Sequence, residues 1–185
     1  VAGATMIAQS RAFGVYSGVR EAVLRMKQQP AAQGAAHPSR YWAEELSRID
    51  YLIEASPLIV EKLRHHAFQI TGIDAHDYRG QDDDGRRQAF EERLRDLIAL
   101  GGRDLLVPEN EALGGFGYRL PEGLFNVDTI KFFEVLVGMQ RCGALDALRS
   151  NDAVVLEIGA GWGGFAYQVK TLFPRVTYVI VDLPE

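Results

Sequence analysis

The sequence lacks the features that mark several large classes of protein. It has a single cysteine, Cys142, so it cannot form an internal disulfide, and we expect a protein of a reducing compartment, the cytoplasm. No apolar run approaches the ~20 residues that a membrane span requires. No basic segment followed by a continuous apolar one opens the chain, so we see no secretory signal. Lys and Arg are not clustered and the formal net charge is −5, so neither a membrane nor a nucleic acid is an expected partner.

What is present is the composition of a globular protein, 47% hydrophobic and 24% charged. Residues 1–150 are expected to be mostly helical, because apolar residues recur there at helical spacing. Ser39 is expected to cap one helix that runs through Ile53, and Ser56-Pro57 to start the next. A further helix with Phe90, Leu94, Leu97 and Ile98 on one face is expected to end at Gly101-Gly102.

The stretch Leu113–Val127 is rich in glycine and predicts a loop or an irregular hairpin. Asp128, directly after it, can cap the helix that follows. The stretch is either a surface connection or a lid over a ligand site, to which Phe116, Tyr118 or Asn126 would contribute. Its aromatic residues are equally compatible with a subunit contact, so a homo-oligomer stays open.

Residues 154–185 predict a β-α-β unit. Val154–Ile158 is an apolar run expected to be a strand buried on both faces, and a glycine-rich turn follows it. A helix is expected from about Gly163 to Phe173, and a second strand over Val176–Val181. Asp182 follows that strand, 19 residues after Gly163, where a carboxylate can accept hydrogen bonds from two ribose hydroxyls. This arrangement is typical of sites for adenosine-containing cofactors.

The glycines of the turn fit two cofactor patterns. Gly159, Gly161 and Gly164 fit the GxGxxG fingerprint of dinucleotide sites, whereas Gly159, Gly161 and Gly163 fit the GxGxG loop of S-adenosylmethionine (SAM) sites. Glu157 lies two residues before the first glycine. A carboxylate there would face the pyrophosphate of NAD at an electrostatic cost, but it would favour the cationic amino group and sulfonium of SAM. We therefore expect SAM, with NAD as the alternative.

Two segments then show a resemblance to a known family. Val155–Gly164 (VLEIGAGWGG) and Val179–Glu185 (VIVDLPE) resemble the first two motifs of class I SAM-dependent methyltransferases. More narrowly, the chain resembles a bacterial family of sugar O-methyltransferases, and the likeness extends upstream to Arg64–Arg79 and Gly114–Glu134. The Asp-Leu-Pro after the second strand is also similar to the ribose-binding turn of plant-type small-molecule O-methyltransferases.

The cofactor-binding residues that this resemblance implies are Glu157, Gly159, Ala160, Gly161, Trp162, Gly163, Asp182 and Leu183. The loop would back the methionine and ribose portions of SAM, Glu157 is the acidic position of the motif, and Asp182 is the ribose acceptor. Trp162 stands where other members often have a different aromatic or a small residue. In such enzymes the adenine pocket, the acceptor site, the general base and any divalent-metal ligands lie downstream, so no catalytic or metal-binding residue is assigned in this chain.

The expected fold class is therefore α/β. A helical N-terminal region over residues 1–150 would lead, over residues 151–185, into the first β-α-β unit of a Rossmann-like SAM-methyltransferase fold. A two-stranded parallel sheet cannot bury both of its faces, so we expect the chain to be a fragment of a longer protein.

The function that this reading predicts is transfer of a methyl group from SAM to a hydroxyl of a small molecule, a sugar or a glycosylated metabolite. The chain would hold only the donor-binding part and would be inactive by itself. An NAD-dependent oxidoreductase fragment and a non-catalytic interaction module are the alternatives.

Overall fold

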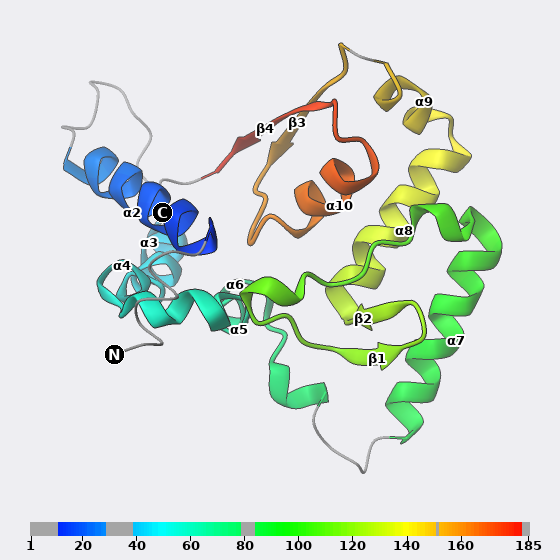
Figure 1. Ribbon diagram of the computed structural model, residues 1–185, viewed down its shortest axis with the longest axis horizontal. Coiled ribbons are helices and arrows are strands. Elements are labelled where there is room, and N and C mark those ends of the chain that lie inside the picture. The colour runs from blue at the N-terminus through cyan, green and yellow to red at the C-terminus, as the bar shows by residue number, and fades with distance from the viewer. Residues whose placement is uncertain (1–10, 29–38, 79–83, 151, 183–185) are drawn as a thin grey trace. The chain divides into compact units, whose positions relative to one another are not determined.

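The computed structural model describes residues 11–28, 39–78, 84–150 and 152–182 (Figure 1). The protein is mixed α/β and mostly helical, with two sheets of two strands each in the described residues. The chain divides into two compact units, which are described separately. Described residues up to Gly72, with Ala112–Gly115, form the first unit, and Ile73–Glu111 with Phe116–Asp182 form the second.

The elements in the described residues of the first unit are all helices. Its elements are α2 (Arg11–Gln28), α3 (Arg40–Ser47), α4 (Tyr51–Glu54), the 3₁₀ helix η1 (Pro57–Lys62), α5 (Leu63–His66) and α6 (Phe68–Thr71). Ser39 caps α3 as predicted, and its Oγ accepts a hydrogen bond from the Trp42 amide at 3.3 Å.

The prediction of one helix from Ser39 through Ile53 is wrong, because the chain breaks between α3 and α4. Beyond the break, side chains of α2 donate hydrogen bonds to carbonyl groups near the end of α4. The Tyr16 hydroxyl donates to the carbonyl of Leu52 at 2.6 Å, and the Arg20 Nε donates to that of Ile53. These contacts lie more than thirty residues apart in the sequence, so local spacing could not reveal them.

The second unit contains the main core. Its helices are α7 (Asp84–Gly101), α8 (Val127–Arg141), α9 (Ala144–Leu148) and α10 (Gly164–Leu172), joined by the 3₁₀ turns η2 (Ala75–Tyr78) and η3 (Arg103–Leu105); η4 (Glu111–Leu113) lies where the chain changes unit. The prediction for α7 is confirmed: Phe90, Leu94 and Leu97 are buried, the helix ends at Gly101, and Gly102 has a φ of 84°. The core of these helices also includes Phe125, Ile130, Phe133, Leu136, Leu145 and Val169.

The glycine-rich stretch before α8 forms a hairpin, as the sequence predicted. Strand β1 (Tyr118–Leu120) pairs antiparallel with β2 (Gly123–Phe125). Gly117 enters the hairpin at a φ of 149°, and a Cβ there would lie 2.1 Å from the Phe125 carbonyl oxygen. Only glycine therefore allows the two backbones to approach this closely.

Helix α8 is capped by Asn126, so the predicted cap at Asp128 is wrong. The amide of Thr129 donates to Asn126 Oδ1 at 3.0 Å, and the amide of Asn126 donates to Thr129 Oγ1 at 2.8 Å, a reciprocal capping box. Asn126 is fully buried, and its Nδ2 donates to Glu109 Oε2 and to the Phe116 carbonyl, each at 2.9 Å. Asn126 therefore joins the hairpin, the segment before it and the start of α8.

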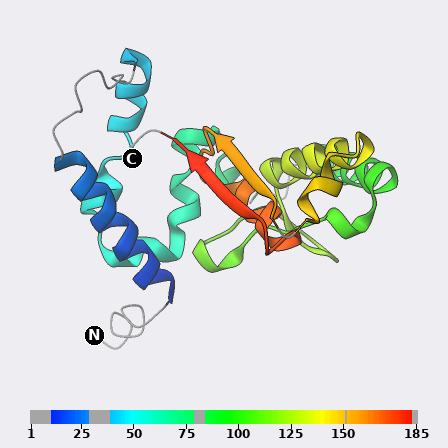
Figure 2. The same cartoon turned by 90° about the horizontal axis from the view of Figure 1, so that it is seen from above.

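The predicted β-α-β segment is present. Strand β3 (Val154–Ile158) has the predicted bounds, and β4 (Thr177–Val181) begins one residue later than predicted; the two pair in parallel, side by side in Figure 2. The expectation that the first strand is buried on both faces is wrong for the described residues. Val154 and Ile158 are 65% and 80% exposed, because α10 covers only the opposite face of the sheet.

We expect the Asn126→Ala variant to lower the free energy of unfolding by roughly 2–4 kcal/mol, because it removes a helix cap and leaves buried groups unsatisfied. Urea denaturation in a Trp42→Phe background measures this, since Trp162 is then the one tryptophan of the chain and reports on the second unit. Ser150→Ala is the matched control, because it removes an exposed side-chain acceptor for the Asp152 amide. Equal midpoints for the two variants would contradict the role given to Asn126.

Candidate functional site

The candidate site lies at the carboxyl edge of the β3–β4 sheet. The register pairs Ile158 with Val181, and the Gly159 amide donates to the Val181 carbonyl at 3.0 Å, so the pairing continues one residue beyond β3. The glycine-rich loop, residues 159–163, leaves the sheet at this edge, and Asp182 leaves it from the neighbouring strand. The structure thus brings together two sequence-predicted features that are about twenty residues apart.

Three glycines of the loop adopt backbone conformations that other residues avoid. Gly159, Gly161 and Gly163 have φ angles of 73°, 57° and 80°. A Cβ added at Gly159 or Gly163 would meet no atom of the described residues within 4 Å. These glycines are therefore required by backbone conformation, and the space beside two of them is open to a ligand.

The side chain of Glu157 lies on the face of the sheet that α10 covers. Its Oε2 accepts a hydrogen bond from the Tyr178 hydroxyl at 2.9 Å. Burial, and after it this hydrogen bond, raises the pKa of Tyr178, so the phenol stays protonated and remains a donor to the carboxylate. Tyr178 therefore holds the orientation of the acidic residue that distinguishes the two cofactor patterns.

Trp162 points from the loop toward helix α8. Its indole Nε1 donates to Asp128 Oδ2 at 3.0 Å, and its ring centroid lies 6.2 Å from that of Phe132. Gly164 lies beneath these rings: a Cβ there would be 2.3 Å from Trp162 Cζ2 and 2.4 Å from Phe132 Cε2. The fourth glycine of the motif is thus required by packing, whereas the other three are required by conformation.

The remaining predicted residues lie around the same edge. Ala160 is half-buried, and its carbonyl accepts a hydrogen bond from the Gly163 amide at 3.0 Å, which closes the turn before α10. Asp182 is exposed directly after β4. Leu183 lies outside the described residues.

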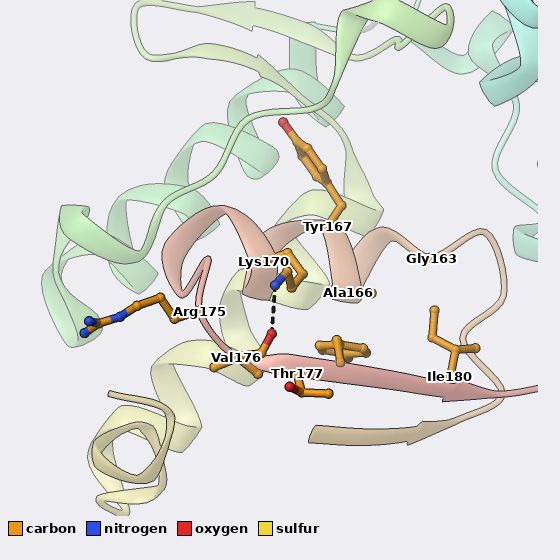
Figure 3. A pocket seen from close by; sticks show the side chains of 9 residues that line it. Gly163, Ala166, Tyr167, Lys170, Arg175, Val176, Thr177 and Ile180 are labelled. Atoms are coloured by element: carbon orange, nitrogen blue, oxygen red, sulfur yellow. Dashed lines mark hydrogen bonds between the residues drawn. The ribbon is translucent and has the colours of Figure 1, made fainter. Parts of the chain in front are cut away.

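An open groove of about 620 Å³ lies between α10 and β4 (Figure 3). Lys170 and Arg175 bring positive charge to it, but neither Glu157 nor Asp182 lines it. The Nζ of Lys170 donates to the carbonyls of Pro174 and Val176, each at 2.7 Å, where α10 has ended. Lys170 thus satisfies backbone carbonyls after the helix, a structural role.

The described part of the chain contains no group of three or more His, Cys, Asp and Glu side chains placed to hold a metal ion. The Nδ1 of His66 instead shares a hydrogen bond of 2.5 Å with the Tyr51 hydroxyl. None of the described helices has both the length and the apolar character needed to cross a bilayer.

The chain matches no model of a known protein family, no curated protein and no solved structure. The geometry of the candidate site therefore carries the functional argument.

Sequence reasoning missed two residues that contact the site. Tyr178 lies diagonally across from Glu157 on the paired strand, and the parallel register would have been needed to find it. Asp128 stands 34 residues before Trp162 and was interpreted as a helix cap. No local pattern could have linked Asp128 to Trp162, because their contact depends on the packing of α10 against α8.

We expect Gly164→Ala to destabilise the second unit by about 1–3 kcal/mol, because the added methyl group overlaps the Trp162 and Phe132 rings. Gly138→Ala is the matched control. Gly138 is an exposed residue of α8, where an added Cβ meets no described atom within 4 Å, and we expect the alanine to stabilise the helix by roughly 0.5–1 kcal/mol. Thermal unfolding of both variants measures the difference, and opposite signs are the expected result. A neutral Gly164→Ala would show that the close approach of the rings is not required.

Proposed function

We propose that the protein is a SAM-dependent O-methyltransferase that acts on a hydroxyl of a small molecule, a sugar or a glycosylated metabolite, and that this chain holds the donor-binding part. The β3–α10–β4 segment would then be the opening unit of a doubly wound Rossmann-like sheet. The observation that carries the proposal is the meeting of the positive-φ glycine loop, Glu157 and Asp182 around one edge of parallel strands.

The residues at this edge suit the donor in backbone conformation and in charge. The loop offers exposed backbone and open space beside Gly159 and Gly163, where a nucleoside can approach the main chain. Asp182 offers carboxylate oxygens suited to the two ribose hydroxyls. Glu157, whose Oε2 is held by Tyr178, supplies negative charge toward the cationic methionine portion.

When bound, SAM would supply a methyl group activated by a positively charged sulfur. The part played by this chain is to bind and orient the donor, so that a hydroxyl oxygen can approach in line with the bond that breaks. The described residues offer no side chain that we assign as a general base, and the acceptor's hydroxyl proton is assigned to no residue of this chain.

The alternative cofactor is NAD. Gly164 packs closely under the loop, and close packing is also the role of the third glycine in dinucleotide fingerprints. Glu157 opposes this alternative, because its charge would lie near a pyrophosphate. A non-catalytic interaction module is the remaining alternative, and it requires no ligand at the loop.

We expect S-adenosylhomocysteine, the demethylated product of SAM, to raise the unfolding temperature of the full-length protein, and NAD at the same concentration to leave it unchanged. A ligand that binds only the folded state stabilises it by mass action. Differential scanning fluorimetry with both compounds measures this. A shift with NAD alone would make the oxidoreductase the better account, and no shift with either would favour the interaction module.

We expect Asp182→Ala to weaken binding of S-adenosylhomocysteine about tenfold or more, because it removes charge-assisted hydrogen bonds to the ribose. Asp152→Ala is the matched control: it makes the same change of charge beside the opposite end of β3, away from the loop. Isothermal titration calorimetry gives both dissociation constants. Equal affinities for the two variants would remove Asp182 from the site.

A further inference from the structure

The first turn of α8 makes two polar contacts with the cofactor segment. Asp128 Oδ2 accepts from the Trp162 indole at 3.0 Å, and the Thr129 carbonyl accepts from Gln168 Nε2 at 3.1 Å. The first contact reaches the glycine-rich loop, and the second reaches the helix that follows it. Asp128, Thr129 and Gln168 are all at least 96% buried, so water does not compete effectively for these groups.

The glycine-rich loop needs such support. Three of its five residues are glycines, which lose the most conformational freedom on folding, and the chain turns there through three positive-φ positions. Trp162 is the large side chain of the loop, and Phe132 and Asp128, both from α8, hold its ring and its indole nitrogen. Because Trp162 lies between Gly161 and Gly163, contacts that hold its side chain also restrain the loop backbone on both sides of it.

We infer that Asp128 is a positioning residue: through Trp162 it holds the glycine-rich loop in its ligand-binding conformation. The effect of Asp128 on ligand affinity rests on the proposed function, whereas its effect on the conformation of the loop does not. A rigid loop binds more tightly because the ordering cost is met before the ligand arrives.

An alternative role for Asp128 is that of a negative charge in the first turn of α8, where it stabilises the helix by interacting with the helix dipole. The two roles respond differently to Asp128→Asn. An asparagine keeps an oxygen that accepts from the indole but carries no charge. Asp128→Asn therefore keeps the hydrogen bond needed for the positioning role and removes the charge, whereas Asp128→Ala removes both.

The experiment compares Asp128→Ala, Asp128→Asn and the control Glu134→Ala, which removes an exposed carboxylate from the same helix. In the ligand-free protein, we expect Asp128→Ala to speed amide hydrogen exchange in residues 159–163 at least tenfold. In a Trp42→Phe background, it should also shift the emission of Trp162 to longer wavelength. Asp128→Asn and Glu134→Ala should stay within about twofold of the parent in exchange rate.

The affinity arm uses S-adenosylhomocysteine. We expect Asp128→Ala to raise the dissociation constant about tenfold, Asp128→Asn by less than about threefold, and Trp162→Phe by about as much as Asp128→Ala. The double variant Asp128→Ala/Trp162→Phe should lose little more than either single variant, because both remove one contact.

The outcomes separate the two ideas. Unchanged exchange of the loop in Asp128→Ala, or equal effects of the Ala and Asn variants, would overturn the positioning role. Additive losses in the double variant would overturn it too, because the two residues would then act independently. If the parent binds no S-adenosylhomocysteine, the proposed function fails, and the ligand-free exchange and emission still decide whether Asp128 holds the loop.

Discussion

The buried start of α8 is where the polar groups of the second unit meet. Asn126 has no exposed surface, caps the helix through Thr129 and donates to Glu109 and to the Phe116 carbonyl. Buried polar groups of this kind must be paired with good geometry, so each partner constrains the others. The hairpin therefore cannot shift without disturbing the helix start, and within its first turn the same helix contacts Trp162 and Gln168.

The buried start of α8 supports the candidate site from one face of the β3–β4 sheet only. Helix α10 packs between the sheet and α8, while Val154, Leu156 and Ile158 form an apolar row that no described residue covers. The supported side carries Glu157 with Tyr178, and the loop above it is tied to α8. The site thus combines a conformationally demanding backbone with side chains held from a neighbouring helix.

The sequence was most informative where the determinants of structure are local. The bounds of β3, the cap of α3 by Ser39 and the end of α7 at Gly101 all follow from nearby residues, and each was predicted. The predictions failed where distant residues decide. Glu109 and the Phe116 carbonyl accept from Asn126 and so favour it over Asp128 as the cap of α8, and the end of the short helix α4 accepts hydrogen bonds from Tyr16 and Arg20.

For the site, the sequence by itself determined the backbone: glycines at 159, 161 and 163 allow the positive-φ turn, and an apolar strand on each side fixes where it occurs. Only the tertiary structure decided which side chains support that turn. Parallel pairing brought Tyr178 to Glu157, and packing of α10 against α8 brought Asp128 to Trp162. The reason is physical: backbone conformation depends on neighbours in sequence, whereas a buried hydrogen bond depends on neighbours in space.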